Sequence, residues 1–98
     1  MVTLDKITII VSSVRHIDVE ILVGPKRNSH YSESRHLFSL IAREQGYDLK
    51  SIAQKLHKDH SSICHGINRA GELIEIDRNY KVDYETIKEL INAERLSN

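Results

Sequence analysis

Residues 48–66 read DLKSIAQKLHKDHSSICHG, and this stretch gives the strongest indication of the fold. Asp48 and Asp59 are each suited to the N-cap position, where a carboxylate accepts a hydrogen bond from the first turn of a helix. Apolar residues follow the first cap at helical spacing: Leu49, Ile52, Ala53 and Leu56. Only His57, Lys58 and Asp59 separate the two predicted helices. This layout predicts a helix-turn-helix over residues 48–76.

The second helix of this pair has two contrasting faces. Its predicted inward stripe is apolar and contains Ile63, Ile67, Ala70 and Ile74. Its predicted outward stripe is polar and contains Ser61, His65, Asn68 and Glu72. In a helix-turn-helix the second helix enters the major groove of DNA with its N-terminal residues first. An ordinary solvent-facing surface is the alternative explanation of the polar stripe.

The N-terminal third is less decisive. Residues 4–14, LDKITIIVSSV, fit a helical stripe, but their β-branched residues favour a strand. Asp18 is a candidate cap for a short turn over residues 19–22. Gly24-Pro25 then breaks the chain, and residues 24–31 are predicted to form a polar, basic loop.

Two further helices are predicted. The first begins at Ser32 or Ser34, buries Leu37, Phe38, Leu40 and Ile41, and stops at Gly46 in the C′ position. The last spans about residues 80–95 with Val82, Ile87, Leu90 and Ile91 as its apolar residues.

The charge balance hides an asymmetry. The 98 residues contain 14 Lys and Arg and 14 Asp and Glu, so the formal net charge is zero. Residues 1–66 hold nine basic and seven acidic residues, and residues 67–98 hold five basic and seven acidic ones. A locally basic surface beside an acidic C-terminal third is a weak indication of a polyanionic partner. Ordinary charge fluctuation on a solvated surface is the alternative.

Several classes of protein are excluded or disfavoured. A single Cys cannot form an internal disulfide and suits a reducing compartment. The longest apolar run, residues 7–11, is too short to span a membrane, and no signal peptide is evident. The phosphate-binding and hydrolase motifs of common enzymes are absent, so we expect no enzyme activity and no cofactor. His57, His60 and Cys64 lack the spacing of a zinc site, so we expect no metal and place Cys64 at the core boundary.

The string KDHSSICHG at residues 58–66 resembles RDHTTVLHA, a signature of the bacterial chromosomal replication initiator DnaA family near its C-terminus. The stretch SRHLFSLIAREQGYDLKSIAQKL is similar to the family's RQxAMxLAxELT…SLPEIGxxF segment. The preceding VTLDKITIIVSSVRHIDVEILVGPKR and the following NRAGELIEIDRNYKVDYETIKEL also resemble the family, in order, over about residues 3–93. The resemblance implies an all-α domain of about six helices, residues 1–98, and a helix at residues 4–14.

The resemblance also implies a function and a set of site residues. Family members bind double-stranded DNA at replication-origin boxes through the major groove and an Arg in the minor groove. Arg27 matches that Arg, and a narrow minor groove attracts a guanidinium. The start of the recognition helix matches at Lys58, Asp59, His60, Ser61 and Ser62. Positions that contact DNA, largely its backbone, match at Arg35, His36 and Arg43, and His65 on the outward stripe completes the predicted DNA-binding set.

The chain departs from the family pattern at the turn. The family has FGGRDH where this chain has LHKDH, which is one residue shorter and has no glycines. The basic loop also has fewer arginines than the family, so we expect a lower affinity for DNA.

The sequence therefore predicts a sequence-selective, cytoplasmic DNA-binding protein of the bacterial nucleoid, initiator-like or regulatory and without ATPase activity. A replication initiator or a separate ATPase is its candidate protein partner. A protein-interaction module on the same helical fold, with weak or no DNA binding, is the alternative.

Overall fold

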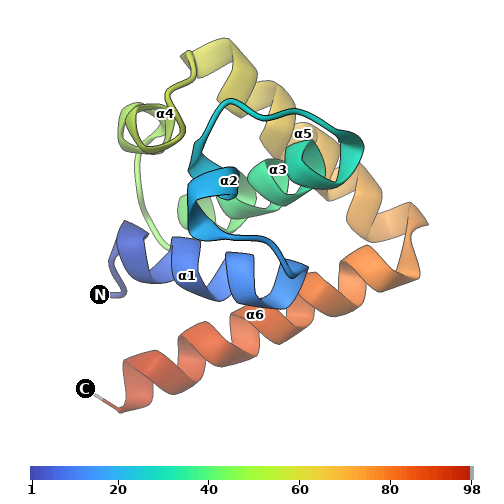
Figure 1. Ribbon diagram of the computed structural model, residues 1–98. Helices are drawn as coiled ribbons and strands as arrows, with labels where there is room; N and C mark the ends of the chain where they lie inside the picture. Colours follow the sequence, from blue (N-terminus) through green and yellow to red (C-terminus); the bar gives the residue numbers. More distant parts are fainter. Residues whose placement is uncertain (98) are drawn as a thin grey trace.

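Six helices account for nearly all of the regular structure in the computed structural model, which describes residues 1–97 (Figure 1). Their bounds are α1 Leu4–Arg15, α2 Val19–Val23, α3 Ser29–Glu44, α4 Leu49–Leu56, α5 His60–Ile76 and α6 Arg78–Leu96. The described residues contain no strand. None of these helices is both long enough and apolar enough to cross a membrane. The predicted all-α class with a helix-turn-helix, formed by α4 and α5, is confirmed.

Side-chain caps begin five of the six helices. In each case the oxygen of the cap accepts a hydrogen bond from the backbone N–H three residues later; the caps are Thr3, Asn28, Asp48, Asp59 and Asp77. The predicted caps at Asp48 and Asp59 are therefore confirmed. Asp18 precedes α2 as expected, but its side chain makes no capping bond. Helix starts in this chain are set locally, by one short polar side chain each.

The prediction for the start of α3 was wrong. The helix begins at Ser29, earlier than the predicted Ser32 or Ser34, because Asn28 accepts from the N–H of Tyr31 at 2.9 Å. The basic loop is consequently shorter than the predicted residues 24–31 and spans residues 24–28. Asp77 likewise starts α6 two residues earlier than predicted.

The ambiguous residues 4–14 lie in a helix, as the family resemblance implied. Ile7 and Val11, one turn apart on α1, are fully excluded from solvent and belong to the core shared by all six helices. Ile9 lies between them in sequence but is 51% exposed. Burial of one helical face thus outweighs the strand propensity of the β-branched residues.

Three chain reversals share one geometry. After α1, α3 and α4 a residue with positive φ ends the helix: His16 at 59°, Gly46 at 100° and His57 at 55°. After α4 the N–H of His57 donates to the Gln54 carbonyl and that of Lys58 to the Ala53 carbonyl. This pair of bonds defines a Schellman motif, and His tolerates the left-handed conformation better than most non-glycine residues. The turn of the helix-turn-helix therefore closes without the glycines of the family pattern.

Helix α3 lies at the centre of the molecule and contacts α1, α2, α4 and α5 (Figure 1). Its residues Leu37, Phe38 and Ile41 have no solvent exposure. Nearby, the buried Arg15 of α1 donates to Ser34 of α3 at 2.9 Å and to Asp83 of α6 at 2.8 Å. This guanidinium joins three helices by paired polar contacts, which offsets the cost of its burial.

The apolar stripe of α5 is rotated from the predicted one. The buried residues are Ile63, Gly66, Ala70 and Leu73, whereas the predicted Ile67 and Ile74 are half-buried. Cys64, expected at the core boundary, is exposed. Gly66 takes a place in the buried stripe because it faces α3 without a side chain, and the His36 side chain of α3 fills the space where its Cβ would be.

Gly71→Ala is predicted to stabilise the fold. Gly71 lies inside α5, and a Cβ added there meets no atom within 4 Å. Alanine should therefore raise the free energy of unfolding by about 0.5–1 kcal/mol through helix propensity alone. Urea denaturation followed by circular dichroism measures the change. Gly24→Ala should lower the free energy of unfolding, because its Cβ would lie 2.5 Å from the Glu20 carbonyl oxygen. Equal effects of the two substitutions would contradict this account.

Candidate nucleic-acid interface

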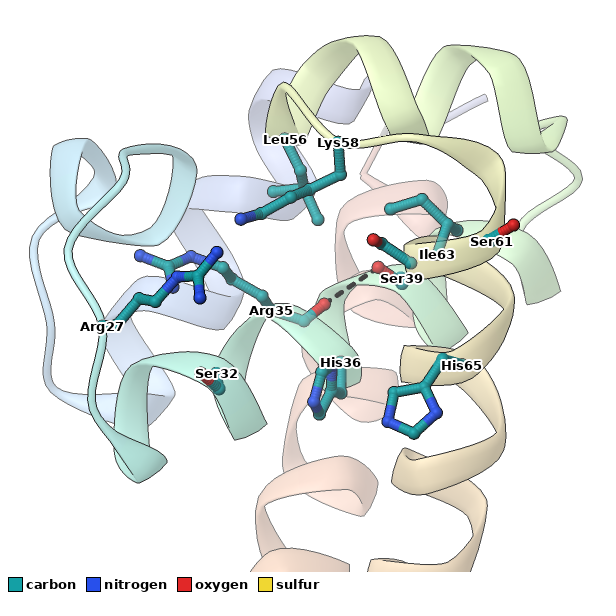
Figure 2. Close-up of a pocket in the computed structure, with 11 residues that line it drawn as sticks. Arg27, Ser32, Arg35, His36, Ser39, Leu56, Lys58, Ser61, Ile63 and His65 are labelled. Carbon is teal, nitrogen blue, oxygen red and sulfur yellow. Dashed lines mark hydrogen bonds between the residues drawn. The ribbon is translucent and has the colours of Figure 1, made fainter.

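A cleft of about 390 Å³ lies between the basic loop, the N-terminal half of α3 and the start of α5 (Figure 2). We call it the basic cleft, and its lining residues are Arg27, Ser32, Arg35, His36, Ser39, Leu56, Lys58, Ser61, Ser62, Ile63 and His65. None of these described residues is acidic, although the whole chain has as many acidic as basic residues. Zero net charge therefore coexists with a locally cationic surface, which suits an anionic ligand.

Seven of the ten predicted DNA-binding residues line this cleft: Arg27, Arg35, His36, Lys58, Ser61, Ser62 and His65. They come from three separate segments of the chain, and the fold brings them together. Sequence reasoning missed Ser32 and Ser39, which lie one turn on either side of the Arg35–His36 pair of α3. Helical spacing from these two residues was the signal that could have identified them.

The other three predicted residues lie outside the cleft. Asp59 and His60 are exposed at the very start of α5. Arg43 lies near the C-terminal end of α3, where it is exposed and its Nη1 donates to the Tyr47 carbonyl at 3.0 Å. Asp59 and His60 thus adjoin the cleft residues Ser61 and Ser62, whereas Arg43 is separated from the basic loop by most of α3.

Arg35 has a structural role that the sequence did not reveal. It is only 5% exposed, and its Nε donates to the Leu22 carbonyl at 2.8 Å. Its Nη2 donates to the carbonyls of Ile21 at 2.7 Å and Lys26 at 2.5 Å. Burial, followed by repulsion from the nearby Arg27, lowers the pKa of Arg35 from its usual value. The guanidinium is thus committed to backbone carbonyls that hold the basic loop, and the contact of Arg35 with DNA stays a prediction.

Arg27 and Lys58 are the cations of the cleft that face solvent. Arg27 is exposed on the basic loop, directly after the Lys26 carbonyl that Arg35 holds. Lys58 is half-buried in the turn between α4 and α5. Figure 2 shows both side chains reaching into the same space from opposite sides. An anion in the cleft would therefore meet a positive charge from each side.

Asp59 combines capping with exposure. Its Oδ1 accepts from the N–H of Ser62 at 2.7 Å. That backbone bond is the main cause of the lowered pKa of Asp59, with the Ser62 side chain contributing next. The carboxylate is therefore charged at neutral pH, and Asp59 is exposed at the end of the helix. An exposed carboxylate can accept a hydrogen bond from the amino group of a cytosine or adenine base.

The side chains of this surface are of kinds that contact nucleic acids. Within residues 1–97, no group of three or more His, Cys, Asp or Glu side chains is arranged to hold a metal ion. Nine of the eleven lining residues carry a cationic group, a hydroxyl or an imidazole, and these groups bind phosphate oxygens and base edges.

Arg35→Lys is predicted to loosen the basic loop. A lysine cannot make the three bonds of the guanidinium fork, and each bond to a charged donor is worth about 1.5–3 kcal/mol. The rate of trypsin cleavage after Lys26 or Arg27 should therefore rise by about tenfold or more, as measured by mass spectrometry. Arg43→Lys, the same change at an exposed position of the same helix, serves as the control. Equal cleavage rates in the two variants would refute the role assigned to Arg35.

Asp59→Ala is predicted to destabilise the protein in a pH-dependent manner. The pKa of Asp59 is lower in the folded state than the usual 3.8. Ionised Asp59 therefore stabilises the fold above about pH 4, and this stabilisation is lost as the pH falls through the lowered pKa. The urea concentration at the midpoint of unfolding should therefore be lower for Asp59→Ala than for wild type at pH 7. Near pH 3 the two midpoints should be closer. Asp59→Asn keeps a capping oxygen, so its midpoint should decrease less than that of Asp59→Ala. An equal decrease in the midpoint of Asp59→Ala at pH 7 and pH 3 would contradict the capping role.

Comparisons with known proteins agree with this architecture. Residues 4–70 match the family model described as bacterial dnaA protein helix-turn-helix. The chain is 35% identical over 95 residues to the chromosomal replication initiator protein DnaA of Aliarcobacter butzleri (strain RM4018) and 30% identical over 94 residues to that of Acinetobacter baumannii (strain AYE). Each match covers 94% of this chain but only 22% and 20% of the relative, so the chain spans about a fifth of their length. From its helix-turn-helix and these matches, the chain belongs to the bacterial DnaA helix-turn-helix family.

Proposed function

We propose that this chain binds double-stranded DNA sequence-selectively, at replication-origin-type boxes, as a single domain. The observation that supports this most directly is a carboxylate-free basic cleft beside the exposed start of α5, in a helix-turn-helix of this family. Its role is initiator-like or regulatory, it acts on the nucleoid, and it binds rather than catalyses. A replication initiator or a separate ATPase is its candidate protein partner.

The proposed docking places the N-terminal turn of α5 in the major groove. That groove is about 12 Å wide and admits one helix. Asp59 and His60 are exposed there, outside the cleft, and can reach base edges. Ser61, Ser62 and Lys58 line the cleft, on the side proposed for the DNA backbone. The N-terminus of the helix adds a partial positive charge beside the phosphates.

Arg27 is proposed to enter the adjacent minor groove. It is exposed on a loop that Arg35 holds at Lys26, so its position is fixed although its side chain is free to extend. The guanidinium is favoured where the minor groove is narrow and its negative potential is enhanced. This contact reads the shape of the groove, while α5 reads the bases.

Exposed apolar residues of α6 favour a second candidate function. Val82 is 51% exposed and Leu90 is 45% exposed, and both lie on a helix outside the basic cleft. Such residues suit a protein-interaction module that binds DNA weakly or not at all. Selection of duplexes from a random pool discriminates between the two functions: enrichment of an initiator-type box supports DNA recognition, and no enrichment supports the interaction module.

Arg27→Ala is predicted to weaken binding to a selected duplex by about tenfold and to reduce the salt dependence. Each phosphate or groove contact contributes about 0.9 to the slope of log K against log salt, so the slope should fall by about that amount. Fluorescence anisotropy at several salt concentrations measures both quantities.

Arg78→Ala is the matched control, because Arg78 is exposed at the start of α6 and outside the cleft. It should leave affinity and slope unchanged. A wild-type slope near zero, or equal effects of the two substitutions, would overturn the proposed function.

A further inference from the structure

The imidazole of His36 occupies the space that a side chain at residue 66 would fill. A Cβ built on Gly66 lies 2.6 Å from Nδ1 of His36, which is closer than real Cβ contacts allow. His36 belongs to α3 and Gly66 to α5, so the missing side chain lets the imidazole lie between the two helices. Figure 2 shows His36 beside His65 at the edge of the basic cleft. Their ring centroids are 6.2 Å apart, with the planes nearly perpendicular.

The charges that act on His36 are all positive. They come from His65 and Arg69 on α5 and from Arg35 on its own helix. Arg27 and Lys58 line the same cleft from the loop and the turn. Two carboxylates lie on the same two helices: Glu72 of α5 is 3.8 Å from Arg69, and Glu33 is one turn before His36 on α3. Neither is among the charges that shift the pKa of His36.

The proposed docking of DNA gives this arrangement a consequence. The sugar-phosphate backbone of one strand separates the minor groove from the adjacent major groove. If Arg27 enters one groove and α5 the other, that strand crosses the basic cleft between them. A phosphate there would lie beside His36, in a cleft with no acidic lining residue.

We propose that the basic cleft binds a phosphate of the DNA backbone and that His36, held against Gly66, takes up a proton as the phosphate enters, which couples DNA binding to pH. This inference rests on the proposed DNA binding. The family resemblance already implies a backbone contact at His36, and the inference adds that this contact depends on a proton.

The direction of the coupling follows from the surroundings of His36. In the free protein, burial is the main cause of the lowered pKa of His36, and the neighbouring cations lower it further. A bound phosphate adds a negative charge that favours the imidazolium form. The complex then binds more protons than the free protein does, so affinity rises as the pH falls from about 8 through the unperturbed value of about 6.5. The gain levels off once His36 of the free protein is also protonated.

The first test compares wild type with His36→Gln, using a fluorescein-labelled duplex of the most enriched sequence from the random pool. The dissociation constant of wild type should fall about three- to tenfold between pH 8 and pH 6, within the limit of tenfold per pH unit for one proton. In His36→Gln, the logarithm of this fold-change should be at most half of the wild-type value. His16→Asn removes an exposed imidazole outside the cleft, where Asn tolerates the positive φ, and should behave as wild type.

The second test uses two glycines of the same helix. Gly66→Ala forces the His36 imidazole out of its position and should reduce both the affinity at pH 6 and the pH effect by severalfold. Gly71→Ala, which makes no new contact, should change neither. In the His36→Gln background, Gly66→Ala should have no further effect on the pH dependence, because the group that it displaces is gone.

Nuclear magnetic resonance gives a readout that a purely structural role would not move. The Cε1–H signal of His36 should titrate at a higher pH in the presence of saturating duplex than in the free protein. Duplex binding with an unchanged His36 titration, or with the same pH effect in His36→Gln, overturns this inference alone. Absence of duplex binding at pH 6 overturns the proposed function as well.

Discussion

Burial of the apolar face of α3 determines where the other elements lie. Leu37, Phe38 and Ile41 are completely removed from solvent, and each such side chain contributes about 1.5–3 kcal/mol when fully buried. Helices α1, α2, α4 and α5 pack against α3 to achieve this. Because successive residues of a helix point in different directions, burying Leu37 and Phe38 fixes where Arg35 and His36 emerge. The basic cleft is therefore a consequence of how the core is packed.

The elements that could be predicted from sequence are those fixed by local interactions. Asp48 and Asp59 each accept from a backbone N–H three residues away, and Gly46 adopts the positive φ expected after a helix. Such features need no information from distant parts of the chain. The start of α3 was mispredicted because Asn28 competes with several nearby serines, and sequence alone does not rank these caps.

The site was only partly predictable, for a different reason. The family resemblance identified Arg27, Lys58 and His36, and the fold brings all three to one cleft. The role of Arg35 depends on carbonyls of α2 and the basic loop that approach it only after folding. The fit of His36 against Gly66 likewise joins residues of two helices. Interactions between elements determine these details, and no periodicity of the sequence encodes them.

The two ends of the described chain lie together, away from the basic cleft. Lys6 of α1 and Glu94 of α6 are 3.7 Å apart, and Met1 and Arg95 line a pocket with Gly46 at the C-terminal end of α3. The cleft surrounds the opposite half of that helix, which is about 24 Å long. Another protein fused at either end would leave the cleft open. Two copies joined there would gain avidity for paired sites, at an effective concentration set by the length of the tether.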